Sequence, residues 1–421
     1  MSDYLPLNSY FERFKTYPPF FDKKISENCG IIITIPCFDD EDLFLTLNSL
    51  QNAQRPKCAV EVIVAVNSAE NTPENIILKN KNIYEKLQEL AGDFRLSGND
   101  RGGYFFELSP ILIENVPKKF AGVGNARKAA MDEAVRHFAQ ISKPDGIIVG
   151  LDCDCLVAEN YFLEIEKVFA QNPDIQLSTF NFQHNFDDKK FSEQEISACK
   201  QYENYLRYYR LALQKTGFPH SFFTIGSCFA VTALAYTKVG GMARLQAGED
   251  FYFLHKAAQY AKHCEITQKI VFPAPRVSDR VPFGTGKAVM KIIENQDFRV
   301  YNPALFTILK TFFESFETIF ENMCHSATPC HSREGGNPLR FDKIPAFAGM
   351  TAMTGCEEII NYFGEDKLWK IFEETFFSTK SKEQFIKRLF SKFDGFFIVK
   401  FLNSFNNSTV FPPVDINVVI Q

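Results

Sequence analysis

The sequence has no long hydrophobic run, no excess of basic residues and no recognisable leader. No segment approaches about 18 uninterrupted apolar residues, so none is predicted to cross a bilayer. A formal net charge of −5 argues against a nucleic-acid partner, because general nucleic-acid binders normally carry a basic excess. The first residues lack a basic stretch followed by an apolar core, so no secretory signal is evident. We therefore expect a cytoplasmic protein.

The sequence also lacks a disulfide or zinc framework. Its eleven cysteines are odd in number and scattered, which favours reduced thiols in a cytosolic protein. Cys153 and Cys155 are one residue apart, but no second Cys or His pair with zinc spacing accompanies them. We therefore expect neither disulfides nor a thiolate metal site.

What the sequence does contain is an alternation of strand-like and helix-like segments. The segments expected as strands are 31–35, 60–66, 147–151, 175–182 and 222–231, and the periodic segments expected as helices are 122–140, 159–170 and 193–215. Such alternation predicts an α/β fold, with a doubly wound, mostly parallel sheet and helices on both faces. At 421 residues the chain is long enough for two or three domains, or for one large domain with an appendage.

Two carboxylates, Asp152 and Asp154, follow the run at 147–151 directly. Strands of an open parallel sheet deliver ligand-binding groups at their carboxyl ends. Two carboxylates one residue apart can hold a hard divalent cation, with a substrate diphosphate supplying further oxygens. Taken alone, Asp-x-Asp after a strand is more often turn or helix-cap chemistry, so the rest of the chain decides between the two interpretations.

Two further segments carry small or acidic residues at positions where ligands often bind. Gly226 and Ser227 lie inside the strand expected at 222–231, and glycine inside a strand often marks the close approach of a ligand or another backbone. Glu249 and Asp250 open a helix, where acidic residues are commonly just caps.

A loop punctuated by glycine and proline contains Arg276 and Arg280. It either binds phosphate through backbone N–H groups and arginine forks, or is a solvated linker. The nearby run 284–287 is not a P-loop, because the required glycine spacing before Lys287 is absent.

Several short motifs follow one another in an order that is informative as a set. They are 31–39, 62–68, 124–128 and 152–154 in the first part, then 223–231, 239–242 and 248–251. In this order they resemble the nucleotide-binding half and the acceptor half of family-2 glycosyltransferases, over approximately residues 30 to 290. The resemblance implies a GT-A fold, a nucleotide-diphosphate sugar donor, a divalent metal and usually inversion at the anomeric carbon.

The resemblance also implies roles for individual residues. Asp152 and Asp154 would hold Mg²⁺ or Mn²⁺, which as a Lewis acid stabilises the leaving diphosphate. Asp250, with Glu249 beside it, would be the base for the acceptor hydroxyl, a function that contributes about 10²–10⁴-fold. The residues expected to contact the nucleotide sugar are Pro36, Asp39, Asn67, Arg127, Asp152, Gly226, Ser227, Arg276 and Arg280. His220 or His255 could add a third metal ligand, although a lone histidine is more often structural.

Two departures from the family pattern leave the nucleotide and the donor contacts open. Asn67 stands where the family commonly has an aspartate that reads the base in uridine-using members, and Lys128 stands where an asparagine often follows the arginine.

Two other functions compete with sugar transfer. A sugar nucleotidyltransferase shares a similar α/β sheet, but it normally has a glycine-rich phosphate loop after the first strand. This chain has the acidic run 39–42 there, which suits the first turn of a helix and would repel a triphosphate. A non-catalytic nucleotide-sugar binding protein is disfavoured because both carboxylate sites are intact.

The domains expected are an N-terminal extension (1–29), a catalytic domain (30–290) and a helical region (291–421). The helical region holds many of the 45 phenylalanines. They would either form the core of a bundle that packs on the catalytic domain or present an amphipathic face to a membrane that carries the acceptor. We favour packing, which leaves peripheral membrane contact as the alternative.

Residues 324–355 are predicted to be a disordered insertion without a catalytic role. Their prolines and glycines interrupt the helical periodicity, which stops near Asn322 and resumes near Glu357. The runs 331–338 and 344–351 resemble peptides translated from bacterial palindromic repeats. A metal site formed by Cys324, His325, Cys330 and His331 is the disfavoured alternative, because their crowding would strain a tetrahedral geometry.

Overall fold

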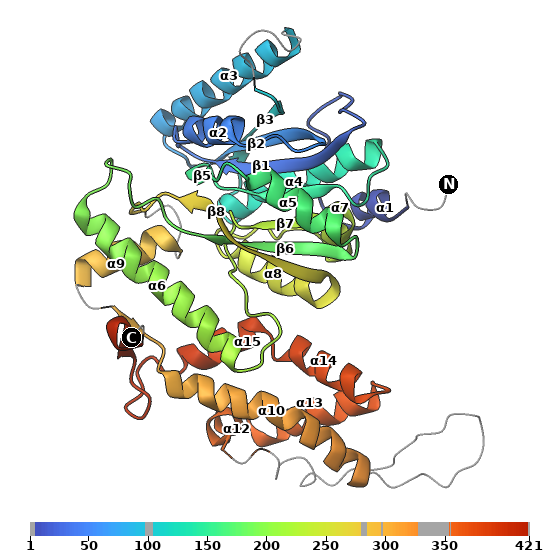
Figure 1. The fold of residues 1–421 in the computed structure, drawn as a ribbon, viewed down its shortest axis with the longest axis vertical. Coiled ribbons are helices and arrows are strands. Elements are labelled where there is room, and N and C mark those ends of the chain that lie inside the picture. Colours follow the sequence, from blue (N-terminus) through green and yellow to red (C-terminus); the bar gives the residue numbers. More distant parts are fainter. Residues whose placement is uncertain are drawn as a thin grey trace. The chain divides into compact units, whose positions relative to one another are not determined.

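The computed structural model describes residues 5–96, 104–278, 284–295, 298–326, 353 and 355–419. The chain forms two compact units (Figure 1). The sheet unit contains Met1–Glu203 and Phe222–Gln296, and the helical unit contains Asn204–Ser221 and Asp297–Gln421.

An eight-stranded sheet organises the sheet unit, in the order β3-β2-β1-β4-β7-β6-β8-β5. The strands are β1 (Cys29–Cys37), β2 (Ala59–Ala69), β3 (Glu107–Val116), β4 (Ile147–Gly150), β5 (Cys155–Val157), β6 (Ile175–Phe182), β7 (Phe229–Thr232) and β8 (Lys262–Pro273). The pairs β1–β2, β1–β4, β2–β3 and β6–β8 are parallel, whereas β4–β7, β6–β7 and β5–β8 are antiparallel. The expected α/β class is therefore confirmed, with a mixed sheet.

Apolar side chains cover both faces of this sheet. Ile32 and Ile148 belong to the core cluster that also contains helix α4. Successive side chains of a strand point to opposite faces, so Ile31 and Ile33 point away from α4, and both are fully buried. A strand buried on both faces explains why the sequence shows continuous β-branched runs here instead of alternation.

Helices flank the sheet (Figure 1). They are α1 (Leu5–Arg13), α2 (Leu43–Asn52), α3 (Glu74–Leu96), α4 (Val123–Gln140), α5 (Tyr161–Gln171), α7 (Ala233–Lys238), α8 (Glu249–Tyr260) and α9 (Thr285–Asn295), while α6 (Glu193–Lys215) contributes residues to both units. The alanine stack of α4, Ala126, Ala130 and Ala134, is fully buried. These small side chains let α4 lie close to β1 and β2, which places the N-terminal end of α4 at the site described below.

One predicted strand is much shorter than expected. The run expected at 222–231 gives only β7, and Gly226 and Ser227 lie in a turn before that strand. The main-chain N–H of Cys228 donates to the carbonyl oxygen of Ile225, which closes the turn. The carbonyl of Gly226 is thereby free of the β-ladder and accepts a hydrogen bond from Arg127 instead.

The N-terminal segment is an integral part of the sheet unit. Leu7, Tyr10 and Ile25 are buried in its main core cluster. The Tyr10 hydroxyl donates to Oδ1 of Asp132 at 2.8 Å, and Lys128 Nζ lies 3.0 Å from Oδ2 of the same carboxylate. Lys128, which stands where the family often has an asparagine, is therefore paired with Asp132 inside the sheet unit.

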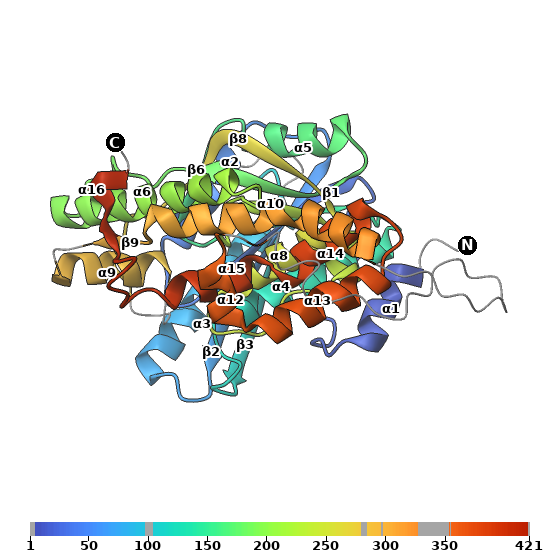
Figure 2. The same cartoon turned by 90° about the horizontal axis from the view of Figure 1, so that it is seen from below.

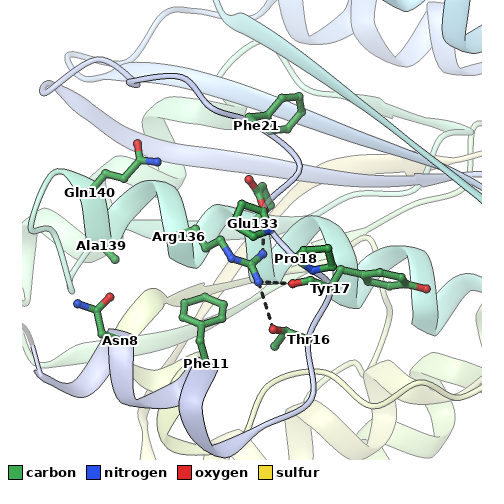
Figure 3. Close-up of a pocket in the computed structure, with 11 residues that line it drawn as sticks. Asn8, Phe11, Thr16, Tyr17, Pro18, Phe21, Glu133, Arg136, Ala139 and Gln140 are labelled. Carbon is green, nitrogen blue, oxygen red and sulfur yellow. Dashed lines mark hydrogen bonds and ion pairs between the residues drawn. The ribbon is translucent and has the colours of Figure 1, made fainter.

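A cavity of about 690 Å³ lies between this segment and the C-terminal part of α4 (Figure 3). Arg136 crosses it and donates to Oε2 of Glu133 at 2.8 Å, to the hydroxyl of Thr16 at 3.1 Å and to the carbonyl oxygen of Tyr17. The guanidinium also lies 4.4 Å from the ring centroid of Phe11. Because its donors already bind the protein, Arg136 ties the N-terminal segment to α4.

The helical unit is built around phenylalanine. Its elements are β9 (Arg299–Val300), α10 (Pro303–Ser326), α12 (Glu357–Phe363), α13 (Glu365–Phe377), α14 (Lys382–Lys392), α15 (Gly395–Asn403), β10 (Val414–Asp415) and α16 (Ile416–Val419), in orange and red in Figure 2. Phe312 and Phe393 meet edge to face with centroids 4.9 Å apart, and Phe316 and Phe372 are equally buried beside them. This burial supports packing as the role of these phenylalanines. None of the helices that the structure describes is long and apolar enough to cross a membrane.

The ends of the predicted insertion lie within the helical unit. Helix α10 continues to Ser326, four residues past the expected end near Asn322. Met353 and Cys356 are buried in the phenylalanine-rich core. The remainder of the predicted insertion, 327–352 and 354, lies outside the described residues, as do the cysteine and histidine of the alternative metal site at 330 and 331.

Candidate active site

The site begins where the neighbouring parallel strands β1 and β4 end. Thr34 pairs with Gly150, and the N–H of Leu151 donates to the carbonyl oxygen of Thr34 at 3.1 Å. The loop after β1 and the loop after β4 therefore leave the sheet at the same edge. The first carries Asp39 and Asp40, and the second carries Asp152 and Asp154.

A buried arginine connects the strand edge to two distant segments. Arg127, in the first turns of α4, is only 2% exposed. Its Nη2 lies 2.7 Å from Oδ1 of Asp152, its Nε lies 3.1 Å from Oε1 of Glu249, and its Nη1 donates to the carbonyl oxygen of Gly226 at 2.8 Å. Burial disfavours the charged guanidinium, but Asp152, Glu249 and Asp250 outweigh that effect and raise the pKa of Arg127 above its usual value. Four segments far apart in sequence are thereby held in one place.

Asp250 lies beside this arginine at the start of α8. Gly248, with φ of 74°, provides the left-handed turn that opens the helix. Burial, followed by repulsion from Glu249, raises the pKa of Asp250 to about 7, although Arg127 opposes the shift. The N–H of Phe251 donates to its Oδ1 at 2.7 Å. A partly buried carboxyl group that titrates near neutral pH is suited to accept a proton.

Gly226 lies in a position that no side chain could occupy without displacing its neighbours. A Cβ atom there would overlap Nη2 of Arg127 and would lie 3.3 Å from Oδ2 of Asp250. The absence of a side chain therefore allows Arg127 and Asp250 to approach the main chain. The adjacent Ser227 is 1% exposed, and its hydroxyl lies 3.6 Å from Sγ of Cys228.

A second arginine pairs with the other carboxylate of the Asp-x-Asp motif. Arg276, three residues after β8, lies with Nη2 2.9 Å from Oδ2 of Asp154 and with Nη1 2.5 Å from Oδ2 of Asp40. Asp40 is 4% exposed, and its Oδ1 accepts from the N–H of Asp42 at 3.1 Å. Burial raises the pKa of Asp154 above its ordinary value, Arg276 opposes this, and Asp152 and Asp40 add to it.

The two motif carboxylates fit a divalent metal in ligand type. Asp152 and Asp154 offer the oxygen ligands that Mg²⁺ and Mn²⁺ prefer. Each of them, however, is paired with an arginine. Within the part of the chain that the structure describes, no group of three or more His, Cys, Asp or Glu side chains could hold a metal ion. A bound diphosphate would supply further oxygens to a metal held by these two carboxylates.

The proposed third ligands are placed elsewhere. His255 is buried on α8, with its ring 4.6 Å from that of Phe251 and 5.7 Å from that of Phe222. His220 belongs to the helical unit, where burial and the charge of Lys387 lower its pKa to about 4.

The expected nucleotide contacts after β1 and β2 have partners within the protein. Pro36 is a buried part of β1. Asp39 adopts φ of 48°, its N–H donates to Oδ1 of Asn80 at 2.8 Å, and its carboxylate lies 3.2 Å from Nζ of Lys79. Asn67 is buried, and its Nδ2 donates to the carbonyl oxygen of Gly122 at 3.1 Å, just before α4. Arg280 lies outside the described residues.

Asp40 and Tyr202 lie at the site but are not among the residues that the sequence predicts for it. Asp40 was part of an acidic run attributed to the start of a helix, but α2 begins only at Leu43, and Asp40 faces Arg276 instead. Tyr202, on α6, is half-buried, and desolvation together with the nearby negative charge of Asp250 raises the pKa of its phenol. Two features of the sequence could have indicated these residues. The acidic run 39–42 is longer than a helix cap needs, and Tyr202 lies on a long helix that carries several tyrosines.

No protein-family model and no curated protein matches this sequence. Among solved structures, S. aureus TarS 1–349 in complex with UDP-GlcNAc is similar at 13% identity and a TM-score of 0.40, over 68% of this chain and 71% of that one. TarS 1–349 without a named ligand gives a TM-score of 0.38 at 12% identity, and the match spans 60% of its length. The mannosyltransferase PcManGT from Pyrobaculum calidifontis, in complex with GDP-Man and Mn²⁺, gives 0.35 at 14% identity, over 85% of this chain and 82% of that one. Scores this low do not assign a function.

Proposed function

We propose that this protein is a glycosyltransferase that moves a sugar from a nucleotide-diphosphate sugar to an acceptor hydroxyl. The observation that carries the proposal is the convergence of Asp152 and Asp250 on one buried arginine. Asp152 lies on the sheet edge where open α/β sheets bind ligands, and Asp250 is a carboxylate that titrates near neutral pH. Glycosyl transfer needs both a site for the diphosphate and a base for the acceptor, and the motifs that resemble family-2 glycosyltransferases include these residues.

Asp250 is the proposed general base. Above about pH 7 the carboxylate is ionised and can take the proton of the acceptor hydroxyl as that oxygen attacks the anomeric carbon. Glu249, whose Oε1 is paired with Arg127, contributes negative charge next to Asp250 and so keeps its pKa high. A base that activates the acceptor on the face opposite the leaving group gives inversion at the anomeric carbon.

Asp152 and Asp154 are the proposed donor-side carboxylates. A bound Mg²⁺ or Mn²⁺ would be held by them and would supply positive charge to the departing diphosphate. Arg127 keeps Asp152 in place, since its other two contacts fix the guanidinium against Glu249 and Gly226. Asp39, Pro36 and Asn67 border the same edge and are proposed to meet the nucleoside.

The experiment that tests this function compares donor binding with turnover. Thermal unfolding is first followed with UDP-, GDP- and other nucleotide-diphosphate sugars, with and without Mn²⁺, because a ligand at 100 times its Kd stabilises the fold by about 2.7 kcal/mol. Hydrolysis or transfer of the stabilising donor is then measured in the wild type and in Asp250→Asn. We expect the variant to bind the donor with unchanged affinity and to lose about 10²–10⁴-fold in turnover.

Three outcomes separate the alternatives. Donor binding without turnover in the wild type would favour a non-catalytic sugar-nucleotide binding protein. Release of pyrophosphate from a nucleoside triphosphate and a sugar phosphate would favour a nucleotidyltransferase, against which the buried Asp40 beside the site argues electrostatically. Full turnover in Asp250→Asn would remove the proposed base.

A further inference from the structure

The two arginines of the site are held in different ways. Arg127 is 2% exposed and has three partners from three segments, so it cannot move without unpacking the core. The side chain of Arg276 is 23% exposed, and among the described residues it is paired with Asp40 and Asp154, both of them carboxylates. Arg276 is therefore the arginine that can leave its partners.

The backbone on either side of Arg276 is fixed. Before it, β8 pairs with β5, and the N–H of Ala274 donates to the carbonyl oxygen of Asp154 at 3.1 Å. After it, Ser278 packs so closely on α9 that a Cβ at Gly286 would lie 2.7 Å from its main-chain nitrogen. A rotation about the side-chain bonds of Arg276 thus suffices to release the two carboxylates, and the guanidinium remains near them.

The guanidinium and a divalent cation would bind the same carboxylate, that of Asp154. Oδ2 of Asp154 lies 2.9 Å from Nη2 of Arg276, whereas a metal ion would take a carboxylate oxygen at about 2.0–2.6 Å. Two cations at one carboxylate also repel each other. Arg276 cannot release Asp154 by losing a proton, because arginine stays charged in proteins.

We propose that Arg276 is an intramolecular competitor of the divalent cation, paired with Asp40 and Asp154 in the free protein and displaced from Asp154 when the cation binds. Asp40 becomes part of the same site through this exchange. The identity of the cation as a donor-bound metal depends on the proposed function, but the exchange itself can be measured without any donor. Once displaced, the guanidinium is a positive fork next to the diphosphate, for which arginine is well suited.

The test titrates the full-length protein with Mn²⁺ alone and follows free Mn²⁺ by its electron paramagnetic resonance signal. Arg276→Gln removes the competitor but keeps much of the side-chain length. We expect it to bind Mn²⁺ at least about tenfold more tightly than the wild type, since charge-assisted hydrogen bonds no longer have to be broken. Adding Asp154→Asn or Asp40→Asn to Arg276→Gln should abolish the gain.

Lys190→Gln is the matched control. Nζ of Lys190 lies 2.5 Å from Oδ2 of Asp42 in the same acidic loop, so this variant also removes one positive charge from the loop but not from Asp154. We expect its Mn²⁺ affinity to change by less than about twofold, as is usual for exposed ion pairs. An equal gain in Lys190→Gln, or no gain in Arg276→Gln, overturns the proposal.

Two further measurements keep the test decisive. If Arg276→Gln does not fold, Arg276→Met is used instead, because it also removes the positive charge. Its affinity should exceed that of the wild type, and an equal or lower affinity overturns the exchange.

UDP and GDP are titrated in parallel with Mn²⁺ present. Tighter Mn²⁺ binding in Arg276→Gln, together with no binding of either nucleotide by the wild type, would uphold the exchange and count against the transferase.

Discussion

Asp152 and Glu249 share the guanidinium of Arg127, with the first carboxylate 2.7 Å from Nη2 and the second 3.1 Å from Nε. Asp152 follows the carboxyl end of β4, a central strand, whereas Glu249 starts a helix later in the chain. The arginine therefore fixes the distance between the proposed donor side and the proposed acceptor side. A substitution of Asp152 or of Glu249 is therefore expected to affect the other carboxylate through the buried side chain of Arg127.

Replacing Arg127 should destabilise the fold strongly. Arg127→Met leaves the carboxylate of Glu249, which is 2% exposed, without its partner. Breaking a buried ion pair from one side costs about 3–5 kcal/mol in the free energy of unfolding. Urea denaturation measures this cost. The control Lys190→Met breaks an exposed pair and should cost no more than about 1 kcal/mol. Similar values for the two variants would show that Arg127 is not a structural centre of the site.

The pH dependence of stability should report on Asp250. Its pKa in the folded protein is about 7, above the ordinary value of 3.8, so folding favours the protonated carboxyl group. This contribution is fully present below pH 3.8 and is lost as the pH rises through about 7. Asp250→Asn stays neutral at every pH.

We therefore expect Asp250→Asn to match the wild type in free energy of unfolding near pH 4 and to exceed it increasingly up to about pH 7, by about 1.4 kcal/mol for each unit of the pKa shift. Denaturation at several pH values measures the difference. Glu249→Gln is the companion variant, because it removes the neighbouring charge and should lower the pKa of Asp250. A constant difference between the wild type and Asp250→Asn across this range would show that Asp250 has an ordinary pKa.

Much of the sheet could be predicted because its strands are buried on both faces. Residues 147–151 form a continuous apolar run and 175–182 carry apolar residues at most alternate positions, and the structure has β4 and β6 there. Strand β3 lies in a polar region that contains Pro110, and β7 is shorter than its apolar run, because the Gly226 turn is fixed by a hydrogen bond from Arg127. That hydrogen bond joins residues 99 positions apart, which no local pattern reveals.

The two motif carboxylates were predictable, but their partners were not. The positions of Asp152 and Asp154 follow from a strand end, which is a local feature. The pairing of Arg276 with Asp40 spans 236 positions and depends on β8 joining β5 at the far edge of the sheet. Helix α2 starts later than the acidic run suggested, and this frees Asp40 for Arg276. The spacing of residues along the sequence does not predict that Arg276 pairs with Asp40.

A methyl group at Gly226 should disturb the site. In Gly226→Ala, Cβ would overlap Nη2 of Arg127, and this atom cannot move away because the guanidinium has three partners. We expect a loss of about 1–3 kcal/mol in the free energy of unfolding, as for overpacked cores, and a larger loss of turnover than of donor affinity. Gly92→Ala is the control, because no described residue has an atom within 4 Å of a Cβ at this position, apart from its neighbours in α3. Alanine should be neutral or stabilise that helix by up to about 1 kcal/mol.

Removal of residues 327–352 should leave the fold and the activity intact. The deletion leaves α10, which ends at Ser326, intact. It also retains Met353 and Cys356, which are buried in the core of the helical unit. A long connection adds little closure entropy, about 0.6 kcal/mol for each doubling, so shortening it should change the free energy of unfolding by no more than about 1 kcal/mol. Met353→Ala is the matched comparison and should cost about 2–5 kcal/mol, because it truncates a side chain that is 1% exposed. Urea denaturation and donor turnover measure both variants. A deletion as damaging as Met353→Ala, or stoichiometric zinc in the wild type that disappears with the deletion, would show that the segment has a role of its own.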